Sequence, residues 1–299
     1  MKMKTSDKTM QLQKKCNEKK DKIKTKKEKQ SLENEFPVSD KQLEYVRKIK
    51  RNQILIRIYQ LLIFIGFLFL WEYTARHDII NDFIFCSPSK LFATLVTMLK
   101  DGSLLFHIGI TLYETLIGFV IVIAGSLIIA TLFWWNKTLS KVLEPYLVIL
   151  NALPKSALAP VLIVWLGANK TTIIVCACSV AIFGSILNIY TGFVNVDADK
   201  IKLIETLKGT RFQCLKLVVL PSNVPNIISI MKVNIGLCLV GVVIGEFLAA
   251  REGLGYLIIY GSQTFKMSNV LLSILILCVI AMLLYMILQH IEKKMSEYF

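Results

Sequence analysis

Residues 197–225 read DADKIKLIETLKGTRFQCLKLVVLPSNVP, and this charged stretch decides how the rest of the chain is interpreted. It lies between two long apolar runs, residues 171–189 and 227–250. Charged side chains do not dissolve in hydrocarbon, so the stretch is expected to face water. Its excess of lysine and arginine predicts the cytoplasmic side of a membrane. The charged residues that stand out are Lys200, Lys202, Glu205, Lys208, Arg211 and Lys216.

Two parts of this stretch have apolar residues at helical spacing. Gly209 permits a break between the two parts, and Leu220-Pro221 is expected to stop the second helix. The sequence therefore predicts a short helix, a turn and a second helix, presented to the cytoplasm. The apolar positions are Ile201, Ile204, Leu207, Leu215, Val218 and Val219.

The composition predicts a membrane protein. The chain has 299 residues, of which 55% are hydrophobic, and its mean hydropathy is +0.58. Soluble domains of ordinary composition are less apolar, so we expect an all-α polytopic membrane protein with six transmembrane helices. The spans lie near residues 54–73, 108–134, 145–167, 171–190, 227–250 and 270–291, and an amphipathic helix is predicted after Pro88.

The amino-terminal region is strongly basic. The first 51 residues carry 17 lysines and arginines against 8 aspartates and glutamates. Residues 1–40 have almost no large apolar side chains, so they cannot bury enough surface to offset chain entropy. We predict a basic cytoplasmic tail over residues 1–52, which is disordered or, as an alternative, a solvated and fraying helix. A six-helix domain is predicted over residues 53–299, whose helix-turn-helix loop is residues 193–225. Six crossings place both termini in the cytoplasm.

The third span contains two prolines, Pro154 and Pro160, each of which would free a backbone carbonyl and kink a helix. A broken backbone cannot face lipid, so this span is expected to face protein or a water-filled path. A purely structural kink is the alternative. The candidate pathway residues near the kink are Asn151, Pro154, Lys155 and Ser156.

The charged stretch and the proline-containing third span resemble those of the binding-protein-dependent ABC transporter permeases, and the resemblance covers about residues 55–291. In that family the cytoplasmic loop reads Glu-Ala-Ala, three residues and a glycine, and later Leu-Pro, which Leu220-Pro221 matches. Trp165-Leu166-Gly167 resembles the end of the family's proline-kinked helix. Glu246, ahead of Gly253-Leu254-Gly255-Tyr256, resembles the family's motif at the external mouth and is a further candidate pathway residue. The resemblance implies a MetI-like ABC importer permease fold.

The front half of the loop departs from the family pattern. Lys202 stands at the position of the family's glutamate, and Gly209 falls one place later than the family's glycine. Whether Lys202 or Glu205 takes the glutamate's place stays open. By the resemblance, the residues that couple to an ATPase subunit are Lys202, Ile204, Glu205, Leu207, Gly209, Arg211, Phe212, Leu220 and Pro221.

The resemblance implies a transport subunit rather than an enzyme. It implies a homodimer with two ABC ATPase subunits and an extracytoplasmic solute-binding protein or lipoprotein, in a branch that handles small solutes such as nitrate, sulfonates and taurine. No G-x-x-x-x-G-K-[ST] phosphate loop occurs in the sequence, so ATP hydrolysis is expected on a separate partner. The scattered cysteines predict no metal site, and no cofactor is expected.

A gradient-driven secondary transporter or channel is the alternative function. It would carry inverted repeats and charges at the centre of the bilayer. No convincing repeat is found, and Glu114, Lys232 and Glu246 lie near the ends of spans. A carboxylate such as Glu114 ordinarily reaches water from there, and a role in binding or gating is its alternative. A multi-pass protein of a bacterial plasma (inner) membrane is expected to contact membrane lipid, and no nucleic-acid partner is expected.

Overall fold

A computed structural model of the protein describes residues 40–77 and 86–296. The predicted disorder of residues 1–39 lies outside this part of the chain. The fold divides into two units, Met1–Leu70 and Trp71–Phe299, and each is described by itself. In both units every described element is helical, as the composition predicts.

The described part of the first unit belongs to helix α2 (Asp40–Arg76). Residues 40–52 of the predicted tail are helical, since α2 already begins at Asp40. Leu43, Val46 and Ile49 recur every three residues there and lead directly into the apolar run of the first span. The helix of the first span therefore extends into the basic region.

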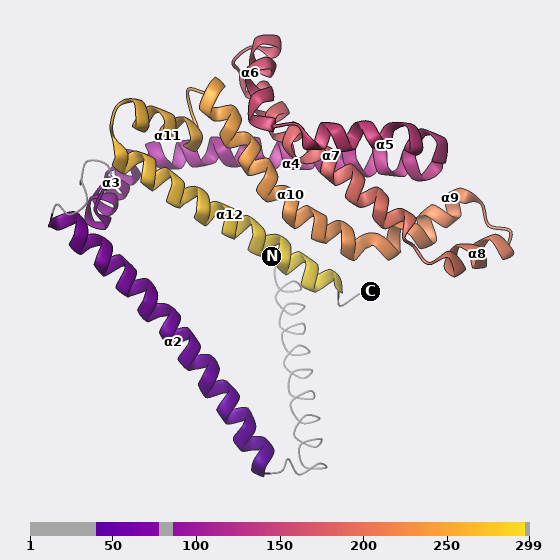
Figure 1. The fold of residues 1–299 in the computed structure, drawn as a ribbon, viewed down its shortest axis with the longest axis horizontal. Helices are drawn as coiled ribbons and strands as arrows, with labels where there is room; N and C mark the ends of the chain where they lie inside the picture. Colours follow the sequence, from indigo (N-terminus) through magenta and orange to yellow (C-terminus); the bar gives the residue numbers. More distant parts are fainter. Residues whose placement is uncertain (1–39, 78–85, 297–299) are drawn as a thin grey trace, which may run out of the picture. The chain divides into compact units, whose positions relative to one another are not determined.

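The second unit contains the last turns of α2 and the remaining helices, which Figure 1 labels. In chain order they are α3 (Pro88–Lys100), α4 (Ser103–Trp135), α5 (Lys137–Ala152), α6 (Lys155–Leu166), α7 (Lys170–Val194), α8 (Ala198–Thr206), α9 (Arg211–Cys214), the π-helical turn η1 (Leu215–Val219), α10 (Leu220–Ala249), α11 (Leu254–Gln263) and α12 (Met267–Ser296).

Five of the described helices are long and apolar enough to cross a membrane, and a sixth span is formed if the bent pair α5 and α6 counts as one. Each of these six segments overlaps one of the six predicted spans, although the helical run that contains the fifth begins at Arg211 rather than near residue 227. The predicted helix after Pro88 is also confirmed, as α3. The five single-helix spans are Arg51–Arg76, Ser103–Trp135, Lys170–Val194, Arg211–Ala249 and Met267–Met295.

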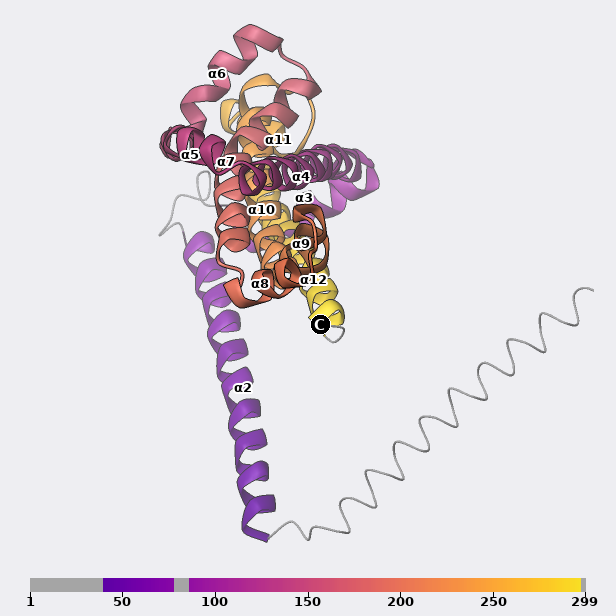
Figure 2. The same ribbon diagram turned by 90° about the vertical axis from the view of Figure 1, so that its right-hand side faces the viewer.

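Helix α7 forms the centre of the second unit, where it packs against both α4 and α10 (Figures 1 and 2). Small residues permit this close packing. A Cβ atom added at Gly241 of α10 would lie 2.6 Å from the Cα atom of Ala177, so only glycine fits there. On the other side of Ala177, a Cβ atom at Gly118 of α4 would lie 3.1 Å from the Ala177 Cβ atom. Ala177 itself is fully buried.

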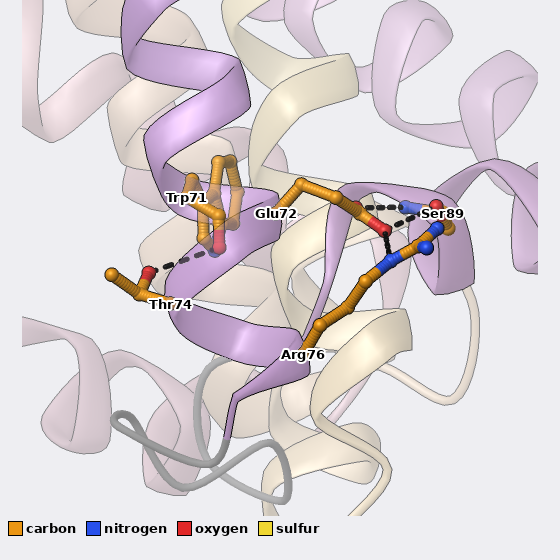
Figure 3. A network of polar contacts seen from close by, with 5 residues as sticks. All are labelled: Trp71, Glu72, Thr74, Arg76 and Ser89. Carbon is orange, nitrogen blue, oxygen red and sulfur yellow. Dashed lines mark hydrogen bonds and ion pairs between the residues drawn. The ribbon is translucent and has the colours of Figure 1, made fainter.

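The end of α2 is joined to the start of α3 by a polar network (Figure 3). The Glu72 carboxylate accepts hydrogen bonds from the Ser89 hydroxyl at 2.7 Å and from the Ser89 backbone N–H at 3.1 Å. It also pairs with Arg76 Nε at 2.7 Å. Since the first N–H groups of a helix lack partners within the helix, Glu72 caps α3 from a neighbouring helix.

The third predicted span is broken at one place rather than two. Helices α5 and α6 meet at an angle of 97° around Leu153 and Pro154. Pro160 lies inside α6, which continues to Leu166, so it does not end the helix. Pro154 sits at the N-cap position of α6, where the missing N–H costs no helical hydrogen bond.

Candidate functional site

The charged stretch forms what we call the coupling segment, residues 197–220, at the junction of α7 and α10. Asp197 caps α8 by accepting a hydrogen bond from the Asp199 N–H at 2.9 Å. Thr210 and Gln213 form a reciprocal capping box at the start of α9. Helix α9 then runs through η1 into α10 without a break, so residues 211–249 form one continuous helical run.

The prediction that Leu220-Pro221 stops a helix is therefore wrong. Pro221 lies in the first turn of α10, and the helical run passes through it. The π-helical turn before it explains why. The N–H of Leu220 donates to the carbonyl of Leu215, five residues back, and this wider turn accommodates the proline ring and its missing N–H.

The turn between α8 and α9 depends on Lys208 and Gly209. Lys208 has a φ of +59°, the left-handed conformation that usually selects glycine at a helix end. Gly209 is needed for a different reason: a Cβ atom there would lie 2.4 Å from the Ile204 Cγ2 atom and 2.9 Å from the Ile204 carbonyl oxygen. The Gly209 N–H donates to that same carbonyl at 2.9 Å. The break predicted at Gly209 is confirmed.

Contacts with the core hold the coupling segment in place. Leu215 and Val219 of η1 are buried in one apolar cluster with Phe193 of α7 and Ala130 of α4. Arg211 donates a hydrogen bond of 3.2 Å from Nη1 to the carbonyl of Trp135, the last residue of α4. Because the last carbonyls of a helix have no partner within it, this bond also caps α4.

The outer face of the coupling segment is apolar as well as basic. Phe212 is 59% exposed and Leu207 is 71% exposed, although both are large hydrophobic side chains. Leu203 and Leu217 are exposed to a similar extent. Large apolar residues gathered on one face typically mark a surface that another protein covers.

The predicted coupling residues divide by exposure. Lys202 and Glu205 are both exposed on α8, and Lys202 makes a surface ion pair of 3.6 Å with Asp199, so the choice between them as a replacement for the family's glutamate stays open. The exposed predicted residues are Lys202, Glu205, Leu207, Arg211 and Phe212, and the half-buried ones are Ile204, Gly209, Leu220 and Pro221.

Four of the predicted pathway residues lie together at the bend between α5 and α6. Lys155 Nζ donates to the carbonyl of Leu150 and lies 4.9 Å from the centre of the Phe183 ring on α7. Asn151 faces Gly184 of the same helix, where a Cβ atom would lie 3.3 Å from the Asn151 Oδ1 atom. Pro154 and Ser156 are exposed at this bend.

Glu246, the fifth predicted pathway residue, belongs to a separate network. It is 1% exposed, and it accepts hydrogen bonds from the Thr111 hydroxyl at 2.7 Å and the Gly255 N–H at 2.6 Å. The Thr111 hydroxyl oxygen also accepts from the Leu254 N–H at 2.9 Å. The start of α11 is thereby bound to both α4 and α10. We call this network the Glu246 latch.

Glycines permit the Glu246 latch. Gly253 has a φ of +104°, and a Cβ atom there would lie 2.2 Å from the Glu246 Oε1 atom. Its N–H donates to His107 Nδ1 at 3.0 Å, which adds a second contact with α4. The Gly-Leu-Gly-Tyr run is therefore the N-terminus of α11, closed over a buried carboxylate, rather than an open loop.

Glu114 differs from its neighbour Glu246. It is also 1% exposed, yet neither of its carboxylate oxygens receives a hydrogen bond from a donor group in the described part of the chain. The expectation that it reaches bulk water is wrong. It lies instead at the side of a cavity of about 280 Å³ between the first half of α4, the start of α7 and the end of α10.

Sequence reasoning missed Thr111 and His107 as partners of the α10–α11 connection. No local pattern could have revealed them, because they are separated from their partners by 135 to 146 residues. The capping box was also missed, although Thr-x-x-Gln before an apolar run is a recognisable helix start.

A family model described as binding-protein-dependent transport system inner membrane component matches residues 121–297. A putative aliphatic sulfonates transport permease of Bacillus subtilis is 24% identical over 229 residues, which are 77% of this chain and 83% of that protein. A probable ABC transporter permease of Haemophilus influenzae is 30% identical and covers 77% of this chain and 94% of its own length. The taurine transport system permease of Escherichia coli is 22% identical, with coverages of 77% and 85%.

Solved structures have the same fold. The inward-facing MetNI methionine ABC transporter has a chain that matches with a TM-score of 0.57 and 15% identity, over 65% of this chain and 97% of that one. A chain of an amino acid ABC transporter, crystallised with histidines, matches with a TM-score of 0.54 and 17% identity, with coverages of 69% and 98%. At these identities the likeness concerns the fold alone.

Proposed function

The chain belongs to the family of binding-protein-dependent transport system inner membrane components, and we propose that its coupling segment docks a separate ATPase subunit to drive the import of a small solute. As a member of that family, it is the permease subunit of an ABC importer rather than the ATP-hydrolysing enzyme. In this proposal the conversion of ATP energy into movement begins at α8 and α9.

One observation carries the proposal: the coupling segment is anchored to the core on its inner side and apolar on its outer side. Leu215 and Val219 are buried, whereas Leu207 and Phe212 are exposed. Basic residues lie among the exposed apolar ones, which favours a surface in water rather than in lipid. A second protein that covers Leu207 and Phe212 would gain the free energy of their burial.

The continuous helical run from Arg211 to Ala249 supports a mechanism for coupling. When the ATPase subunits close, a displacement of α8 and α9 would pass through η1 into α10, and through the Arg211–Trp135 hydrogen bond into α4. The two core helices would then change their arrangement between inward-open and outward-open states. Coupling of this kind requires that the ATPase binds the two states with different affinity.

The assembly that fits this mechanism is a homodimer of the chain with two ATPase subunits on the cytoplasmic side and a solute-binding protein on the other. The basic coupling segment and six spans support an orientation with both termini in the cytoplasm. Similarity to permeases named for aliphatic sulfonates and for taurine supports a small sulfonate or a related anion such as nitrate as the solute.

Co-purification from the native membrane tests the proposal. We expect an ATPase subunit to accompany the tagged chain, and its hydrolysis in lipid to be stimulated by the solute-binding protein. Leu207→Ser should release the ATPase, because it places a hydroxyl in an apolar contact. Leu248→Ser is the matched control, since Leu248 is also exposed but lies at the opposite end of α10.

Purification of the chain alone, together with solute movement under an imposed ion gradient, would contradict the proposal and favour a secondary transporter. Equal release of the ATPase by Leu207→Ser and Leu248→Ser would show that the coupling segment is not the docking surface.

A further inference from the structure

The cavity beside Glu114 lies at the face of the second unit opposite the coupling segment. It contacts the end of α10 at Ala249, whereas the coupling segment joins the start of α10 at Leu220. Figure 2 shows the same separation, with α6 and α11 at one end and α8 and α9 at the other. If the coupling segment is cytoplasmic, this cavity opens toward the side from which a solute is delivered.

The inner wall of the cavity includes a carboxyl group that receives no hydrogen bond from a donor group in the described part of the chain. Glu114 lines the cavity and is almost completely buried, and among the described residues the polar group that acts on its oxygens is the carboxyl group of Glu246. A buried charge costs several kcal/mol unless it is paired. Glu246 is close enough to repel it, which adds to that cost, and the only favourable charge that acts on it within the described residues is that of Lys170.

The neighbouring carboxylate, that of Glu246, does receive hydrogen bonds from donor groups of the protein. Glu246 receives a hydroxyl proton from Thr111 and a backbone N–H from Gly255, one at each oxygen. Its role in the latch is therefore complete without a further partner. Glu114 is the group in this region that would gain most from a cationic or hydrogen-bond-donating ligand.

The outer rim of the cavity has the opposite charge. Lys170 and Arg251 both line it, and Glu252 pairs with Lys170 at 3.8 Å, in an exposed and therefore weak contact. Two cations and one anion leave the rim with a net positive charge. An acidic group on a ligand would be attracted there, while an ammonium group would be attracted to Glu114.

The size of the cavity restricts the ligand. Its volume of about 280 Å³ is below the range of about 300–1,000 Å³ that is usual for sites of drug-sized ligands. Since each water in the liquid takes about 30 Å³, the space corresponds to roughly nine waters. A solute with few heavy atoms fits within this volume.

We propose that this cavity binds a small zwitterionic solute, with Glu114 accepting its ammonium group and Lys170 and Arg251 facing its acidic group. The proposal rests on the import function and narrows its solute class from a simple anion to a molecule with both charges. It assigns Glu114 a direct contact with the solute.

A thiol introduced at the cavity provides the test. Ala250→Cys places it on the lining, and the tagged chain, purified with its bound subunits but without the solute-binding protein, is treated with a water-soluble thiol reagent. The extent of modification at position 250 is read by peptide mass spectrometry, which separates it from the native cysteines. The probes are taurine, which has an ammonium and a sulfonate group, and ethanesulfonate, which lacks the ammonium group.

We expect taurine to protect the introduced thiol at a concentration at least tenfold lower than ethanesulfonate. Glu114→Gln should raise the taurine concentration needed by at least tenfold, because the variant keeps the shape of the side chain and removes its charge. Glu144→Gln, an exposed carboxylate on α5 outside the cavity lining, is the matched control and should change that concentration little. Arg251→Gln should weaken protection by both probes.

Several results would overturn the proposal. They are the absence of protection by taurine, equal protection by the two probes, and unchanged protection by taurine in Glu114→Gln. The last result is expected if Glu114 is satisfied by a proton shared with Glu246. Unliganded labelling and gel-filtration profiles like those of the parent show that a variant is folded, and Glu114→Asp, which keeps the charge, should retain more protection than Glu114→Gln.

The same preparation separates this proposal from the import function. If the ATPase subunit co-purifies and taurine gives no protection, the import function stands and the zwitterion site fails. If taurine protects and no ATPase is present, the site stands and the import function fails.

Discussion

The two ends of α10 differ in how they meet the rest of the chain. At the Ala249 end, Glu246 is closed in by Thr111 and Gly255, and its carboxylate is fully hydrogen-bonded. At the Leu220 end, the helical run continues into a segment that leaves Leu207 and Phe212 exposed. The first end is complete within one chain, and the second has an apolar surface that the proposed ATPase partner would cover.

This contrast separates two kinds of substitution. Changes at the closed end should reduce the stability of the chain itself. Changes at the open end should leave that stability nearly unchanged and reduce the affinity for the ATPase. Measuring stability and association in the same variants therefore tests the comparison directly.

The largest effect on stability is expected for Glu246→Ala. The substitution removes two hydrogen bonds to a carboxylate and leaves the Thr111 hydroxyl and the Gly255 N–H buried without it, at a cost of about 2–5 kcal/mol. For a unit of this size that lowers the midpoint of thermal unfolding by at least roughly 4 °C. The measurement is a thermal melt of the purified protein in detergent.

Glu252→Ala is the control for this prediction, because Glu252 is a half-exposed carboxylate in the same connection, 3.8 Å from Lys170. It should change stability by less than about 0.5 kcal/mol. Equal midpoints for the two variants would mean that the Glu246 latch does not hold α11 in place.

The six spans could be predicted from sequence because each needs only enough consecutive apolar residues to cross hydrocarbon. The same physics predicted a broken third span, since Pro154 cannot donate a backbone hydrogen bond. It could not decide between Pro154 and Pro160. Pro160 is accommodated within α6, and Pro221 is accommodated by the π-helical turn before it, so a proline alone does not define a break.

The only parts of the candidate site that could be predicted are those formed by residues close together in the sequence. The turn at Gly209 follows from residues that are neighbours in sequence. Glu246 was identified through its motif, whereas its partner Thr111 comes from a helix 135 residues away, and no periodicity encodes that contact. Glu114 was expected to reach water because it lies near a helix end, but the packing of the helices leaves only 1% of it exposed.

The second prediction concerns the open end of α10. Phe212→Ala should leave the free energy of unfolding within about 0.5 kcal/mol of the parent's, because the ring is 59% exposed in the chain alone. It should weaken association with the ATPase by about 2 kcal/mol, or roughly 30-fold, which is typical of a central aromatic residue in an interface. The affinity can be measured as the binding of soluble ATPase to surface-immobilised permease in detergent.

Val164→Ala is the control for Phe212→Ala, because Val164 is 83% exposed but belongs to α6. Its association with the ATPase should equal that of the parent. If Phe212→Ala destabilises the chain while association per folded molecule is unchanged, the exposed ring belongs to the fold and the contrast between the two ends is wrong.

The smallest effect is expected at Lys208, within the turn of the coupling segment. Its φ of +59° is unfavourable for a lysine and favourable for glycine. Lys208→Gly should therefore stabilise the turn by about 0.5–1 kcal/mol, which slows amide hydrogen exchange in α8 by roughly two- to fivefold. Lys202→Gly is the matched control, since Lys202 lies within α8 in helical conformation, where glycine costs about 1 kcal/mol and should accelerate exchange. If both variants accelerated exchange equally, the backbone at Lys208 would not be left-handed.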